Sequence, residues 1–100
     1  MDAAVYEVRG ETLIIKLPKE VDHCNSTEIR KEADKQIYNG QVRNVEFDFS
    51  DTTFMDSSGI GMIMGRHRLI KPLGGKITLI GVTGNIERIV NVSGLCKLLK

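Results

Sequence analysis

The alternation of apolar and polar positions predicts four strands. The pattern is clearest where Val45, Phe47 and Phe49 alternate with polar residues, because successive side chains of a strand point to opposite faces. Strands are also expected at residues 5–8, 13–17 and 76–82. The first two form a hairpin through Gly10, since glycine supplies the positive φ that a tight turn needs. Pro18 ends the second strand because it cannot donate to a strand ladder.

Three other segments have the apolar spacing of helices. Ile29, Ala33 and Ile37 recur every four residues and form one apolar stripe among charged neighbours. This helix is expected to begin at Asn25, which can cap the backbone while Glu28 reaches back to it. If the helix begins at Asn25, the preceding residues 22–24 lie in a loop.

A second helix is expected to end near Lys71, at the proline and glycines that follow it. A third helix starts at Thr83 or Asn85 and ends at Gly94. The leucines after Gly94 are expected to form a last short strand or a packing tail.

The order of these elements predicts one α/β domain over residues 1–100, in the order β-β-α-β-α-β-α. Strands that alternate with helices imply right-handed crossovers around a partly parallel sheet. The first hairpin makes this sheet mixed, with four to five strands. Because the strand at residues 44–49 has one polar side, we expect the helices mainly on one face.

The composition excludes several classes of protein. The chain has 100 residues with a formal net charge of +1 and five aromatic residues per hundred, so neither a basic field nor a base-stacking surface for nucleic acid is expected. No apolar run approaches the about 20 residues that span a bilayer, and the N-terminus has no export signal. Cys24 and Cys96 form no CxxC pair, so reduced cysteines and a cytoplasmic location are expected.

The segment with the most chemical character is Phe54–Gly65, FMDSSGIGMIMG. Its residues Asp56, Ser57 and Ser58 follow a strand and precede a helix, at the kind of junction where open α/β sheets place functional sites. Asp and Ser are also the preferred helix N-caps. One cap needs one such residue, whereas three stand in a row. Capping alone and a functional role therefore both stay open.

Three glycines weaken the helix that follows. An internal glycine costs about 1 kcal/mol relative to alanine. Gly61 and Gly65 are four apart and share a face, so we expect them to allow close packing against the sheet or another backbone. Gly59, in the first turn, serves either packing or a ligand.

Two enzymatic interpretations of this segment fit poorly. A serine hydrolase needs G-x-S-x-G with a histidine and a carboxylate, but the leading glycine is missing. His67 lies more than two turns along the same helix as the serines. A dinucleotide site needs G-x-G-x-x-G, whereas this chain has G-x-G-x-x-x-G and no P-loop lysine.

A phosphate accepted by a serine is the third interpretation. A helix N-terminus offers free N–H groups and the positive end of the helix dipole to such a group. The added charge, about −1.5 to −2, would lie beside Asp56 and change the surface that a partner meets. On this hypothesis the modification blocks docking without refolding the domain.

The segments FMDSSGIGMIMGRHRLIKPLGGKITLIGV and NIERIVNVSGL resemble the anti-sigma factor antagonist family, the bacterial STAS domain, in its sporulation type. The resemblance covers nearly the whole chain. It implies a regulator without enzymatic activity, whose unphosphorylated form binds an anti-sigma factor that is also a serine kinase and so frees the sigma factor. Phosphorylation abolishes this binding, and a PP2C-type phosphatase restores it. The implied acceptor is Ser57, the serine immediately after the aspartate.

We expect the partner-binding surface to surround this serine. Its candidate residues are Asp22, His23, Asp56, Ser58, Gly59, Ile60 and Met64. Asp22 matches an acidic loop position near the acceptor in family members, although an exposed acid is about as often merely solvated. Ile60 and Met64, four apart, form either an adaptable contact patch or part of the core. Arg66, Arg68 and Lys71 are expected on a solvated face, or against an acidic kinase surface.

Other expectations are less specific. No cofactor or metal is expected, since His23 has no second ligand at a useful spacing. Family members usually carry a final strand and a C-terminal helix after the SGL segment, whereas this chain stops at Lys100. The shorter end is a reason to expect a homodimer. The alternative function is a STAS-type scaffold or transport accessory subunit, in which Ser57 only caps a helix.

Overall fold

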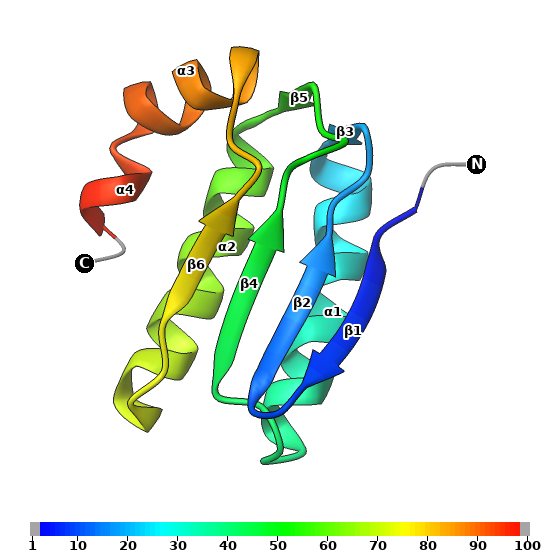
Figure 1. Cartoon of the computed structure of the whole chain (residues 1–100), viewed down its shortest axis with the longest axis vertical. Helices are drawn as coiled ribbons and strands as arrows, with labels where there is room; N and C mark the ends of the chain where they lie inside the picture. Colours follow the sequence, from blue (N-terminus) through cyan, green and yellow to red (C-terminus); the bar gives the residue numbers. More distant parts are fainter. Residues whose placement is uncertain (1–2, 99–100) are drawn as a thin grey trace.

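A mixed sheet lies at the centre of the structure, a computed structural model that describes residues 3–98. Its strands lie in the order β1-β2-β4-β6 (Figure 1). They are β1 (Val5–Arg9), β2 (Thr12–Lys16), β4 (Asn44–Asp48) and β6 (Ile77–Ile80). β1 runs antiparallel to β2, whereas β4 is parallel to both of its neighbours, β2 and β6. The predicted mixed sheet and its first hairpin are confirmed, and Gly10 has the expected positive φ of 62°.

Two long helices cover one face of this sheet (Figure 1). They are α1 (His23–Tyr38) and α2 (Ser57–Ile70), and they pack against each other. A short 3-10 helix, η1 (Lys71–Leu73), continues α2. The remaining helices, α3 (Gly84–Ser93) and α4 (Leu95–Leu98), follow β6 at the edge of the molecule. The opposite face of the sheet is open, as the polar side of β4 predicts.

The core fills the space between the sheet and the two long helices. Val45 and Phe47 of β4 are fully buried, as are Leu13 and Ile15 of β2. The predicted stripe of α1 is also buried. It consists of Ile29, Ala33 and Ile37. The pattern of apolar and polar residues therefore predicts correctly which residues of the sheet and of α1 are buried.

The start of α1 differs from the prediction. The helix begins at His23, and its N-cap is Asp22, not Asn25. The Asp22 carboxylate accepts a hydrogen bond from the Asn25 N–H at 3.0 Å, and the Asn25 side chain accepts one from the Asp22 N–H at 2.9 Å. Asn25 thus takes the third helical position of a capping box. The predicted loop over residues 22–24 is wrong, because His23 and Cys24 belong to the first turn.

Two short strands were not predicted. β3 (Glu20–Val21) and β5 (Phe54–Met55) pair in parallel as a separate ladder. Two residues are too few to show an alternation. Their pairing holds the segment before α1 against the segment before α2, so the N-termini of both long helices lie at the same end of the molecule (Figure 1).

The segment after Gly94 takes one of its two predicted forms, a tail that packs against the core. It is the helical turn α4, so the predicted strand is wrong, while Leu95 packs fully buried in the core. Gly94 ends α3 with a φ of 73°. The side chain of Leu98 and the whole of Leu99 lie outside the described residues. No helix in residues 3–98 combines the length and the apolar character needed to cross a membrane.

Candidate site at the N-terminus of α2

Ser57 is the first residue of α2, and its side chain is exposed. The cap is supplied by Asp56, whose carboxylate accepts hydrogen bonds from the N–H groups of Ser58 at 2.8 Å and Gly59 at 3.4 Å. One residue of the Asp-Ser-Ser step therefore caps the helix, as predicted. Among residues 3–98 the Ser57 hydroxyl makes no hydrogen bond. It is free to face another molecule.

The predicted partner-binding residues of α1 and α2 meet across the two helix ends. The Asp56 N–H donates to the Val21 carbonyl at 3.0 Å, which is part of the β3–β5 pairing. The Ser58 hydroxyl lies 3.4 Å from Nδ1 of His23. Asp22 is exposed next to this contact. The structure thus gathers Asp22, His23, Asp56 and Ser58 around Ser57, although they come from two distant segments.

Gly59 is required by packing. A Cβ at this position would lie 2.9 Å from Cγ1 of Val21, and it would also overlap the Met55 side chain. Both neighbours are buried residues of β3 and β5. Of the two predicted roles of Gly59, the structure supports close approach of α2 to these strands.

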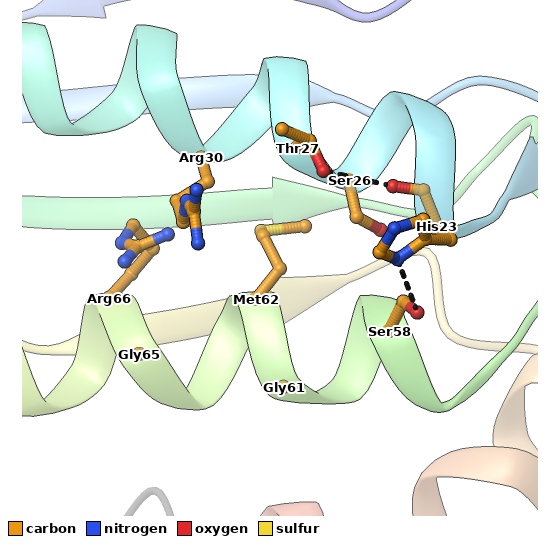
Figure 2. Close-up of a pocket in the computed structure, with 9 residues that line it drawn as sticks. All are labelled: His23, Ser26, Thr27, Arg30, Ser58, Gly61, Met62, Gly65 and Arg66. Atoms are coloured by element: carbon orange, nitrogen blue, oxygen red, sulfur yellow. Dashed lines mark hydrogen bonds between the residues drawn. The ribbon is translucent and has the colours of Figure 1, made fainter.

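Gly61 and Gly65 do not have the predicted packing role. A Cβ at either position would have no heavy atom within 4 Å, so neither glycine permits a close approach. Both line an open groove between α1 and α2 (Figure 2). Ile60 and Met64 flank them and are partly buried against the core, so each presents only part of its side chain to a partner.

The groove between α1 and α2 has a volume of about 320 Å³. The residues that line it are His23, Ser26, Thr27, Arg30, Ser58, Gly61, Met62, Gly65 and Arg66. Figure 2 shows the hydroxyl groups and His23 near one end and the two arginines near the other. The groove begins at Ser58, directly beside Ser57. Sequence analysis did not predict it, because its walls come from segments that only the fold brings together.

Arg66 is not on a solvated face, which corrects the prediction. Its side chain is 8% exposed, and its Nε lies 2.8 Å from Oδ1 of Asp34 on α1. Burial lowers the pKa of Arg66, while Asp34 raises it and Arg30 lowers it further. The helical spacing carried a signal that was missed, since Arg66 is three residues after the buried Ile63. Arg68 is exposed, as predicted.

The geometry does not assemble a hydrolase site. His67 is buried on α2, away from the exposed Ser57 at the helix start. The only histidine contact to the Asp-Ser-Ser step is the exposed one between His23 and Ser58, and no carboxylate orients His23 among the described residues. Within residues 3–98, no cluster of three or more His, Cys, Asp and Glu residues could hold a metal ion.

Comparison with known proteins finds similarity in both sequence and fold. A family model described as the STAS domain matches residues 3–100. The anti-sigma F factor antagonist of Paenibacillus polymyxa is 36% identical over 87 residues, which are 87% of this chain and 74% of that protein. The structure of the anti-sigma factor antagonist SpoIIAA in its unphosphorylated form gives a TM-score of 0.79 at 31% identity, covering 89% of this chain and 82% of that chain. The structure of SpoIIAA of Bacillus in its phosphorylated form gives a TM-score of 0.79 at 31% identity. This match covers 98% of this chain and 89% of that chain.

Proposed function

Since the chain belongs to the STAS domain family, we propose from that premise that it is an anti-sigma factor antagonist regulated by phosphorylation of Ser57. In this proposal the unphosphorylated domain binds an anti-sigma factor with serine kinase activity and so releases a sigma factor. Names and structures of the relatives support the antagonist role. A structure of SpoIIAA in a phosphorylated form supports the modification. The observation in this chain that carries the proposal is the exposed Ser57 hydroxyl, which makes no hydrogen bond among the described residues.

The proposed modification is a phosphoryl transfer from ATP held by the kinase. The Ser57 oxygen attacks the γ-phosphorus, its O–P bond forms, and the bond to the leaving ADP oxygen breaks. The hydroxyl proton passes to a base of the kinase. Because Asp56 already caps the helix, Ser57 can be modified without loss of the cap.

The phosphate would act through charge. It brings about −1.5 to −2 units to a surface that already carries Asp22 and Asp56. A partner that docks closely on this surface must then desolvate three negative groups, which weakens the complex. The proposed contact surface comprises Asp22, His23, Asp56, Ser58, Gly59, Ile60 and Met64. Gly59 contributes backbone only, and Ile60 and Met64 contribute their exposed parts.

Further parts of the proposal concern other partners. A PP2C-type phosphatase removes the phosphate and restores binding. The protein acts in the cytoplasm and has no enzymatic activity of its own.

Two copies associate through the open face of the sheet, where Val5 is 61% and Ile80 38% exposed. Light scattering of the purified chain tests this dimer, and a monomeric mass at high concentration contradicts it.

Two substitutions at Ser57 test the central proposal. Ser57→Ala should stay bound to the kinase in the presence of ATP, because it cannot accept a phosphate. Ser57→Asp should bind poorly, since it places a charge at the same position. A pull-down with the cognate kinase measures both, and equal retention of the two variants would contradict the proposal.

Intact-mass measurement supplies the control. After incubation with kinase and ATP, the natural chain and Ser58→Ala should each gain one phosphate, and Ser57→Ala none. A chain that binds no kinase and gains no phosphate would favour the alternative, a STAS-type scaffold or transport accessory subunit.

A further inference from the structure

The groove between α1 and α2 is lined by buried side chains with polar atoms that make no hydrogen bond among the described residues. Ser26 is 5% exposed, and its hydroxyl has no hydrogen-bond partner among the described residues. Arg66 is 7% exposed, and its Nη1 also lacks a partner there. Both residues line the groove. Buried polar groups are normally hydrogen-bonded, so these two groups in one cavity have hydrogen-bonding capacity that a ligand can fill.

The charges of the groove point to an anion. Arg30 and Arg66 both line it, and Figure 2 shows their side chains close together. Asp34 lies 2.8 Å from Nε of Arg66 without the alignment of a hydrogen bond. Among residues 3–98 this carboxylate pairs with Arg66, and Arg30 forms no ion pair. A bound anion would balance the second positive charge and would supply acceptors to both guanidinium groups.

The glycines keep the groove open. Alanine is the better helix former at both positions by about 1 kcal/mol, and a Cβ would meet no atom within 4 Å at Gly61 or Gly65. Neither folding nor packing thus explains two glycines on this face of α2. A ligand that lies against the helix backbone does explain them.

We infer that this groove is a binding site for a phosphate group. Guanidinium forks match the oxygens of phosphate, and Ser26 can donate its free hydroxyl proton to a further oxygen. Thr27 already donates to the His23 carbonyl at 3.1 Å, so its hydroxyl offers only an acceptor. Met62 is the one large apolar side chain in the lining, so the site recognises a charged group and not an apolar body.

The site is separate from the acceptor proposed above. Ser57 does not line the groove, although its neighbour Ser58 does. A phosphate group held by Arg30 and Arg66 would lie toward the end of the groove away from Ser58 (Figure 2). The inference rests on Ser26, Arg30 and Arg66 and holds whether or not Ser57 is ever phosphorylated.

Titration of the unphosphorylated chain with inorganic phosphate tests the inference. We expect saturable changes in the ¹H–¹⁵N amide spectrum at Ser26, Arg30, Gly61 and Gly65, with sodium chloride holding the ionic strength constant. The same titration on Ser57→Ala should give the same result. Absence of saturable changes at these amides would overturn the inference, and it would leave the phosphorylation of Ser57 untouched.

Matched variants locate the site. Arg30 and Arg68 are both exposed, so each Arg→Gln change removes one charge at little risk to the fold. Arg30→Gln should weaken phosphate binding by about tenfold, the size expected for a lost charge-assisted contact, and Arg68→Gln should leave it unchanged. Equal effects would show binding to net charge alone and overturn the inference. Acetate at the same ionic strength should bind more weakly, and equal binding would contradict a phosphate site.

Discussion

At the scale of single residues, the three residues of the Asp-Ser-Ser step make different contacts. Asp56 caps α2, and Ser58 contacts His23. Ser57 is exposed, and its hydroxyl makes no hydrogen bond within residues 3–98. A cap and a modification site can therefore coexist without competing for one side chain. If Ser57 is phosphorylated as proposed, the phosphate would change the surface while the helix keeps its cap.

Alanine substitutions at two glycines of α2 are expected to change the stability of the domain in opposite directions. Gly59→Ala should lower the free energy of unfolding by about 1–3 kcal/mol, the cost of overpacking a core, because its Cβ would lie 2.9 Å from Val21. Gly61→Ala should raise it by up to about 1 kcal/mol, since its Cβ meets nothing within 4 Å. Urea unfolding of both variants measures the difference. A loss of stability in Gly61→Ala equal to that of Gly59→Ala would refute our assignment of the groove.

From the sequence alone Ser57 could be proposed as an acceptor, but the burial and contacts of the neighbouring residues could not be predicted. Aspartate and serine at a strand–helix junction can be recognised from the amino-acid sequence, so Asp56 and Ser57 could be chosen as candidate site residues. The burial of Arg66 was missed, because charge was given more weight than its spacing from Ile63. Gly61 was given the packing role that the structure shows for Gly59, since both are glycines and only their three-dimensional neighbours differ.

At the scale of elements, the predictions succeeded where a period extends over many residues. The stripe of α1 and the alternation of β4 each repeat several times, so both elements were predicted with the correct buried face. β3 and β5 have two residues each, too few for any period. The start of α1 was placed late because Asp22 and Asn25 are both good caps, and only geometry shows that they act together.

The cap of α1 provides a test that separates folding from binding. Asp22→Ala should lower the free energy of unfolding by about 1 kcal/mol, because the Asn25 N–H loses its acceptor. Asp22→Asn should change it little, since asparagine caps about as well as aspartate. Thermal unfolding of the two variants measures this contrast.

The same pair of variants examines the role of the Asp22 charge. If the carboxylate steers the kinase, Asp22→Asn should bind it more slowly at low salt while its stability is unchanged. An association rate equal to that of the natural chain would show that Asp22 serves only as a cap.

At the scale of the whole molecule, the fold separates the site from the core. The sheet and the inner faces of α1 and α2 hold the buried apolar residues, whereas the candidate site lies at the shared N-terminal end of both helices (Figure 1). The net charge of the chain is only +1, so one phosphate reverses its sign. A modification here should alter recognition and leave the core intact.

The most direct test is the affinity of the kinase for the chain before and after complete phosphorylation of Ser57, with the fold monitored by circular dichroism. We predict a loss of at least about tenfold in affinity, within the usual range of coupling between sites, an unchanged spectrum, and recovery after phosphatase treatment. Equal affinity of both forms, or a loss of affinity that appears only when the domain unfolds, would contradict the account.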